Sequence, residues 1–197
     1  MVLVLLKLAL SIFVICYNKD MKKIILKCKL ENRDRFEDKL SDIDLDFSNI
    51  YWQHDRVYVP RGYKRGMNLP RLVMRTEMQE VDVPPKYSLI LRRDIEDYGV
   101  DIIEETPVTD YATTVNIILQ LGFKPAGEVS RRRQELEMGE GTKIYLDEID
   151  GREDEHYAKI ESNLGVDDSV AEAKTDLKKT FETLGESNFV ESAYFEL

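Results

Sequence analysis

Short stretches in which apolar and polar residues alternate recur along the chain from Met21 onward. This alternation is typical of strands with one apolar and one polar face. The stretches are rich in β-branched and aromatic residues, and the loops between them contain Gly, Pro, Asn or Asp. The predicted strands are Lys22 to Leu30, Ile50 to Val59, Arg71 to Glu77, Tyr87 to Arg93, Val100 to Thr106 and a pair joined by a Gly-rich turn within Val129 to Glu161.

Helical spacing of apolar residues predicts three helices among these strands. They span Glu31 to Leu40, Thr109 or Asp110 to Leu121, and Asp168 or Ser169 to Leu184. Gly122 and Gly185 follow the last two helices, where glycine commonly ends a helix. The apolar end of the chain, Phe189 to Leu197, is expected to dock on the fold. The sequence therefore predicts an α+β protein with dominant antiparallel strands and helices packed outside them.

The predicted strands within Val129 to Glu161 carry charge on one face, because successive side chains of a strand alternate sides. The residues that share these charged faces are Arg131, Arg133, Glu135 and Glu137 in the first strand, and Lys143, Tyr145 and Asp147 in the second. A charged face toward water is ordinary in an antiparallel sheet. If the sheet closes, the same face lines an interior that binds an ion.

Composition narrows the classes of protein that fit. Hydrophobic residues make up 43% of the 197 residues, which excludes a disordered tail. The net charge of -10, from 28 basic and 38 acidic residues, argues against a nucleic-acid binder with a generally basic surface. The two cysteines and two histidines lack metal-ligand spacing. The expected location is therefore the reducing cytoplasm.

The N-terminal segment from Met1 to Cys16 is apolar apart from Lys7 and Ser11. Its length is short for a spanning helix, which needs about 20 residues. Three interpretations remain. The segment follows a start codon that is not used, and Met21 is the true start; or it is a membrane anchor; or it is a poor signal peptide. The predicted organisation is a leader over 1–20 and one domain over 21–197, with membrane association only if the leader is retained.

Basic residues recur at even spacing on several predicted strands, as in Lys27 and Lys29, and in Arg71 and Arg75. If these faces line one closed barrel, the interior holds many cations and a few carboxylates. A polyphosphate would satisfy such an interior, because Lys and Arg give charge-assisted hydrogen bonds to phosphate oxygens. Carboxylates beside a bound phosphate would favour a divalent metal.

The order of several local motifs resembles that of the CYTH family, which includes class IV adenylyl cyclases, thiamine triphosphatases and other triphosphate tunnel proteins. The resemblance covers nearly all of the chain from Met21 to Leu197. The matching stretches are Gln53 to Tyr58 ("Q-x-D-x-Y"), Arg71 to Arg75 ("L-R-x-R"), Leu89 to Arg93, Glu105 to Asp110, Leu121 to Pro125 ("L-G-F-K"), Val129 to Arg133, Tyr145 to Gly151 and Glu191 to Leu197.

This resemblance implies a barrel of about eight antiparallel strands that forms a triphosphate-binding tunnel. The phosphate ligands that it implies are Lys27, Arg71, Arg75, Arg92, Arg131 and Arg133, with Arg93 as the alternative to Arg92. The acidic positions that it implies for magnesium or manganese are Glu105, Asp147 and Glu161. The implied ligand is a triphosphate-containing small molecule such as ATP, inorganic triphosphate or thiamine triphosphate. Family members often pair, so a homodimer is one alternative.

The chain departs from the family pattern at Lys23, Ile25 and Lys159, which stand where acidic residues are expected. Losing three carboxylates removes much of the oxygen coordination that a metal needs. Three hypotheses follow. The chain is a metal-dependent triphosphatase or adenylyl cyclase, a non-catalytic polyphosphate or nucleotide binder, or a relic whose interior charges pair with one another.

Overall fold

The computed structural model of the protein describes residues 22–64, 67, 69–79, 82–95, 100–139, 141–165 and 168–190. The leader over 1–20 and the closing segment over 191–197 lie outside these residues, so the predicted domain boundary stays a prediction. No helix in the described part of the chain has the length and apolar character needed to cross a membrane.

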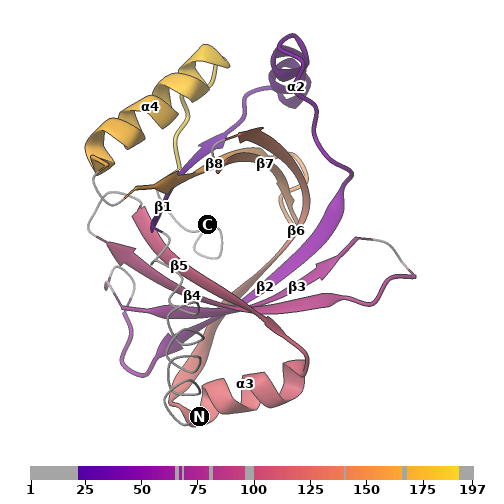
Figure 1. The fold of residues 1–197 in the computed structure, drawn as a ribbon. Helices are drawn as coiled ribbons and strands as arrows, with labels where there is room; N and C mark the ends of the chain where they lie inside the picture. The colour runs from indigo at the N-terminus through magenta and orange to yellow at the C-terminus, as the bar shows by residue number, and fades with distance from the viewer. Residues whose placement is uncertain are drawn as a thin grey trace, which may run out of the picture.

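Eight strands and three helices make up the described residues, which confirms the predicted α+β class (Figure 1). The strands are β1 (Lys22–Lys29), β2 (Tyr51–Pro60), β3 (Arg71–Met78), β4 (Lys86–Ile95), β5 (Val100–Val108), β6 (Phe123–Gly139), β7 (Thr142–Ile149) and β8 (His156–Leu164). The helices are α2 (Arg33–Ser41), α3 (Tyr111–Gln120) and α4 (Val170–Thr183).

The strands pair antiparallel in the order β1-β5-β4-β3-β2-β6-β7-β8, and β1 also pairs with β8. The order therefore returns to its start and forms a barrel. The β1–β8 ladder runs the whole length of β1, from Lys22 opposite Leu164 to Lys29 opposite Tyr157. The β1–β5 ladder joins only Lys22 to Ile24 with the start of β5, so it is a short seam.

Side chains at the helix starts explain where the helices begin. Asn32, Asp110 and Ser169 each accept a hydrogen bond from a backbone N–H in the first turn of α2, α3 and α4. The two predicted glycine stops are also present, because Gly122 and Gly185 have φ of 91° and 81°. These left-handed conformations suit glycine and end α3 and α4.

Two apolar clusters lie outside the barrel, between the strands and the helices. On one side, α2 and α4 cover β1, β6, β7 and β8 (Figure 1), and the core there includes Ile24, Phe36, Leu146, Ile160 and Phe181. On the other side, α3 lies against β2 to β6, over a second core that contains Tyr58, Met74 and Ile118. Because side chains alternate along a strand, the opposite face of every strand turns toward the interior.

Two predictions about the strands differ from the structure. Val129 to Glu161 holds three strands instead of two, because the acidic run after Gly151 makes a turn between β7 and β8. The strand β6 also begins earlier, at Phe123, since its pairing with β2 continues to Pro60 opposite Phe123. The exposed Pro125 and Ala126 give no strand signal of their own, so only the pairing partner extends β6.

The end of the described chain docks as expected. The backbone N–H of Val190 donates to the Lys27 carbonyl over 2.9 Å, and Phe189 forms a bridge with Cys28. The Phe189 ring also meets that of Phe181 edge to face, with 6.0 Å between centroids. This contact attaches the end of the chain to β1 and α4.

Candidate functional site

Strand register identifies the side chains that face the barrel interior, because paired residues project from the same side of a sheet. Arg131 stands opposite Gln53 and Ile149, and Arg133 opposite Tyr51 and Asp147. Following the register around the barrel places every predicted site residue on this one face. These residues are Lys27, Arg71, Arg75, Arg92, Arg131, Arg133, Glu105, Asp147 and Glu161.

Cations outnumber carboxylates on the interior face among the side chains that the structure describes. The cations are Lys23, Lys27, Lys29, Arg71, Arg75, Lys86, Arg92, Arg131, Arg133, Lys143 and Lys159. The carboxylates are Asp55, Glu77, Glu105, Glu135, Glu137, Asp147 and Glu161. An interior of this composition attracts anions even though the chain as a whole carries a net charge of -10.

Asp55 joins two arginines in the middle of the barrel. Arg75 donates to both Asp55 oxygens, with Nε–Oδ1 of 2.7 Å and Nη2–Oδ2 of 3.0 Å, and Arg131 pairs with Oδ2. Arg131 also donates to Oε1 of Gln53. Burial opposes ionisation, but the charges of Arg131 and Arg75 outweigh it and hold the pKa of Asp55 well below its usual value.

Asp147 and Arg133 form a second buried pair beside the first. Arg133 donates to both carboxylate oxygens over 2.6 and 2.7 Å, and the Nε of Arg131 lies 3.9 Å from Oδ1. Asp147 is fully buried and Arg133 is 2% exposed. Here too burial opposes ionisation, and the Arg133 charge outweighs it to lower the pKa of Asp147.

Glu161 is the centre of a third group of charges. Its Oε1 accepts from Lys159 over 2.6 Å, and its Oε2 lies 3.5 Å from the Nζ of Lys23 and 3.3 Å from the Tyr145 hydroxyl. The Nζ of Lys159 and the guanidinium of Arg133 lie 4.1 and 4.4 Å from the Tyr145 ring centroid. Tyr145 thus lies between two charge pairs and holds their cations close together.

The remaining predicted phosphate-binding cations are less buried than Arg75, Arg131 and Arg133. Lys27 and Arg71 are half-buried on the interior face. Arg92 is also half-buried, and its Nε is enclosed without a hydrogen-bond partner in the described part of the chain. Arg93, the alternative to Arg92, is exposed and projects from the opposite face of β4. Of the two, Arg92 is therefore the one placed to contact a ligand in the interior.

The predicted metal carboxylates do not come together. No group of three His, Cys, Asp or Glu residues that could hold a metal ion is found within the described residues. Asp147 and Glu161 are bonded to cations, and Glu105 is exposed and accepts a hydrogen bond from Ser88 over 2.6 Å. The convergence that a magnesium or manganese site requires is thus missing among these side chains, and the donor set does not fit the metal.

One wall of the interior is apolar, which was not predicted. Val57, Val73, Ile90 and Ile103 are buried on the interior faces of β2 to β5, and Ile25 packs against them. Asp55 and Gln53 also belong to the interior network although they were not predicted as site residues. Their even spacing within the apolar strand Tyr51–Pro60 was the available signal.

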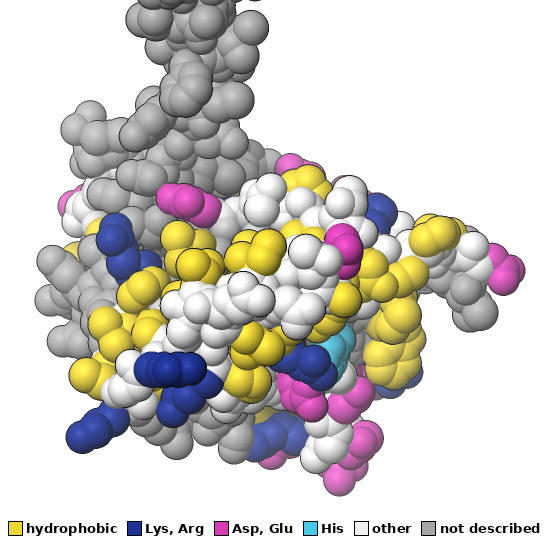
Figure 2. All heavy atoms as spheres, turned by 90° about the horizontal axis from the view of Figure 1, so that it is seen from below, with side chains coloured by type: hydrophobic (Ala, Val, Ile, Leu, Met, Phe, Trp, Pro, Cys, Tyr) yellow, Lys and Arg dark blue, Asp and Glu magenta, His cyan; other side chains and the backbone are white. Residues whose placement is uncertain are grey.

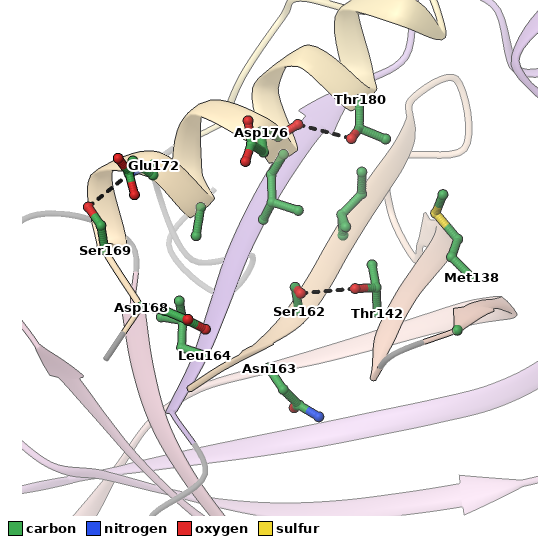
Figure 3. Close-up of a pocket in the computed structure, with 14 residues that line it drawn as sticks. Met138, Thr142, Ser162, Asn163, Leu164, Asp168, Ser169, Glu172, Asp176 and Thr180 are labelled. Atoms are coloured by element: carbon green, nitrogen blue, oxygen red, sulfur yellow. Dashed lines mark hydrogen bonds between the residues drawn. The ribbon is translucent and has the colours of Figure 1, made fainter. Parts of the chain in front are cut away.

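A groove lies outside the barrel, between α4 and the outer face of β7 and β8 (Figure 3). Its volume is about 600 Å³, and Ile160 and Leu177 contribute apolar lining. Its acidic side chains are Asp168, Glu172 and Asp176, and no Lys or Arg is among its lining residues. This groove, called the α4 groove below, has the wrong charge for a phosphate.

The face of the molecule that carries α3 differs from the α4 groove because it exposes apolar side chains (Figure 2). Ile117, Leu119 and Leu121 expose apolar side chains there, with 69% of Leu121 accessible. The Lys and Arg side chains in this view lie in separate groups and do not form a continuous basic patch.

Comparison with known proteins tests the fold. No model of a known protein family matches the sequence, and none of the curated proteins matches it. A protein from Pyrococcus horikoshii OT3 matches the structure with a TM-score of 0.75 and 21% identity, over 88% of this chain and 96% of that chain. A putative adenylate cyclase from Vibrio parahaemolyticus matches with a TM-score of 0.71 and 18% identity, over 90% and 98% of the two chains.

A third match is the putative adenylyl cyclase from Hippeastrum with a dominant triphosphatase activity. Its TM-score is 0.57, with 16% identity over 89% of this chain and 94% of that chain. The chain has the CYTH-type fold. The resemblance predicted from the order of the motifs is thereby confirmed at the level of the fold, whereas identities this low leave the activity open.

Proposed function

We propose that the chain binds a triphosphate-containing small molecule in the barrel interior, which then serves as a tunnel for the polyanion. The candidates are inorganic triphosphate, thiamine triphosphate and ATP, as predicted from the sequence. The observation that carries the proposal is the excess of Lys and Arg over carboxylates on one inward-facing surface. Phosphate oxygens accept the charge-assisted hydrogen bonds that such side chains offer.

The buried donor of Arg92 supports the same proposal. A guanidinium nitrogen enclosed without a partner is unfavourable, because buried polar groups that lose water need another hydrogen bond. Arg92 stands opposite Arg71 in the β3–β4 ladder, so the two guanidinium groups start from neighbouring positions on the interior face. A phosphate between these strands would accept from the Arg92 Nε.

The second candidate function is metal-dependent hydrolysis or cyclisation of the triphosphate. The fold of the Vibrio parahaemolyticus and Hippeastrum proteins favours it, since these are named as putative adenylyl cyclases. The pairing of Asp147 and Glu161 with cations weighs against it. Turnover of tripolyphosphate and ATP with magnesium or manganese, measured beside binding, separates this candidate from simple binding.

Substitution of two neighbouring arginines, one at a time, tests the binding proposal. Arg92→Met removes an interior cation that forms no ion pair with another described residue. Arg93→Met removes an exposed cation from the other face of β4. A hydrogen bond to a charged group is worth roughly 1.5–3 kcal/mol, so Arg92→Met should weaken tripolyphosphate binding roughly tenfold to a hundredfold. Calorimetric titration should show no change for Arg93→Met.

Three results would count against the proposal. Equal effects of the two substitutions would mean that the site is not in the interior. Absence of binding by the unchanged protein would favour the relic, in which the interior charges satisfy one another. Binding confined to long nucleic acids would contradict the expectation of a small-molecule ligand. Cytoplasmic location and pairing into a homodimer stay predictions.

A further inference from the structure

Among the described side chains, each of the three most buried carboxylates in the interior already has both oxygens occupied by protein cations. Asp55 is bonded by Arg75 and Arg131, Asp147 by Arg133, and Glu161 by Lys159 and Lys23. Hard divalent ions need several carboxylate oxygens at once, and these oxygens are engaged. A metal could bind here only by displacing an arginine or a lysine.

Lys159 is the clearest example. It is 5% exposed, its Nζ lies 2.6 Å from Glu161, and it stands in β8 opposite Tyr145 and Lys27. Burial and the nearby Arg133 charge lower the pKa of the Lys159 amino group well below the usual value, and the Glu161 carboxylate beside it acts in the opposite direction and favours the ammonium form. Like charges repel strongly in a surrounding of reduced polarity, so a divalent ion at Glu161 would face Lys159 and Lys23 at short range. The arrangement disfavours a metal and favours an anion.

The positions of these cations are also fixed before any ligand arrives. Lys159 and Arg133 both lie against the Tyr145 ring, and the Tyr145 hydroxyl is 3.3 Å from the carboxylate of Glu161. Cations held in place by packing lose little freedom when an anion binds, which raises affinity. A ligand thus meets a preformed group of positive charges.

We propose that Lys159 and Lys23 act as fixed internal cations at Glu161 in place of a divalent metal, so that the interior binds its polyphosphate without metal. This proposal rests on the proposed function, because it concerns the same interior face. It assigns a role to two lysines that stand where the family resemblance predicts carboxylates. It also makes Glu161 a competitor of the ligand for Lys159.

Glu161→Gln tests this role, because the two explanations predict changes of opposite sign. If Lys159 serves the ligand, removing the competing charge should tighten tripolyphosphate binding by about tenfold, equal to about 1.4 kcal/mol. If Glu161 is a metal ligand, the same substitution should weaken binding. Glu172→Gln makes the identical change in the α4 groove and should leave the affinity unchanged within about twofold.

The titration is made with the full chain and inorganic tripolyphosphate, first with a chelator and then with excess Mg²⁺. The proposal expects binding with the chelator, weakened about tenfold by Mg²⁺, because the metal occupies phosphate oxygens that the lysines need. Binding that requires Mg²⁺ would overturn the proposal while leaving the proposed function intact. Absence of binding in both conditions would overturn both.

The titrations with chelator and with Mg²⁺ use the unchanged protein. They therefore show whether binding needs a metal even if Glu161→Gln fails to fold. A further variant replaces Lys23, Ile25 and Lys159 together with Glu, which supplies the carboxylates that the family pattern expects. We expect this variant to bind tripolyphosphate only with Mg²⁺ or Mn²⁺. Metal-independent binding by this variant as strong as that of the unchanged protein would contradict a role for the lysines.

Discussion

The barrel interior and the α4 groove are two surfaces built on opposite faces of the same strand. From β8, Lys159 and Glu161 lie on the interior face, whereas Ile160 and Ser162 line the groove. Figure 3 shows Ser162 on the groove side, beside Thr142. The interior is rich in Lys and Arg, and the groove has three acidic residues and no basic ones among its lining residues. One alternating sequence thus produces two surfaces of opposite charge. The acidic one forms a groove of about 600 Å³.

The comparison also separates two kinds of charge. Interior charges such as Arg133 and Asp147 are buried and bonded to each other, so their removal leaves a partner without compensation. Groove charges such as Asp176 are open to water, and Asp176 pairs with the exposed Lys179. Interior charges should therefore control both stability and binding, and groove charges neither.

The largest expected effect follows from breaking the Arg133–Asp147 pair. Arg133→Met leaves Asp147 buried without its bidentate partner and should lower the free energy of unfolding by roughly 3–5 kcal/mol. Asp176→Asn, which breaks an exposed pair, should lower it by less than about 0.5 kcal/mol. Urea unfolding of both variants measures the difference.

A double substitution supplies the control for this prediction. Arg133→Met combined with Asp147→Leu removes both charges and should recover most of the lost stability, because no buried charge is left unpaired. Equal small losses for Arg133→Met and Asp176→Asn would show that the interior pair is not buried in solution.

Lowering the pH should destabilise the protein mainly through the carboxylates of the interior. The pKa values of Asp55 and Asp147 are lowered, since nearby arginine charges outweigh the effect of burial. A carboxylate with a depressed pKa contributes stability above its unfolded pKa of about 3.9 and loses it as the pH falls toward the folded value. The free energy of unfolding should therefore fall steadily as the pH drops from about 5, and urea unfolding at several pH values measures it.

Asp55→Asn shows whether the interior is responsible for this dependence. The variant should be less stable at neutral pH but should lose less stability on acidification, because its side chain no longer takes up a proton. Asp168→Asn in the α4 groove should leave the slope unchanged. The opposite result would be a free energy of unfolding that keeps its steep dependence on pH in Asp55→Asn and loses it in Asp168→Asn. That result would place the pH-sensitive carboxylates in the groove and contradict the prediction.

The smallest expected effect concerns filling the α4 groove. Ala173 is half-buried and lines the groove, so Ala173→Leu would occupy part of its volume. Tripolyphosphate affinity, measured by calorimetry, should change by less than about twofold, because the groove offers no cation to phosphate. Loss of binding in Ala173→Leu would indicate that the groove, and not the interior, holds the ligand.

Much of the fold could be predicted from local patterns. Alternating residues located most of the strands, and Asp110, Ser169, Gly122 and Gly185 marked the ends of two helices. The stripe of α4 at Leu177 and Phe181 is buried as its spacing predicted. These signals lie within one turn or one strand, so the sequence carries them directly.

The site was only partly predictable, because alternation shows that two faces differ without showing which face is inside. The same spacing of Arg131 and Arg133 fits a solvated surface and a closed interior. Pairing of Asp55 with Arg75 and Arg131 depends on the register of three strands, so it could not be found from any one of them. The apolar wall around Val57 and Ile90 has the same non-local origin.

The most direct test of a polyphosphate site in the barrel is a crystal structure of the full chain grown with tripolyphosphate and a metal chelator. We predict electron density for the phosphates in the interior, within hydrogen-bond distance of Arg92 and Lys159. Phosphate density in the α4 groove, or an interior in which the pairs of Arg133 and Lys159 are unchanged and no phosphate is bound, would contradict this account.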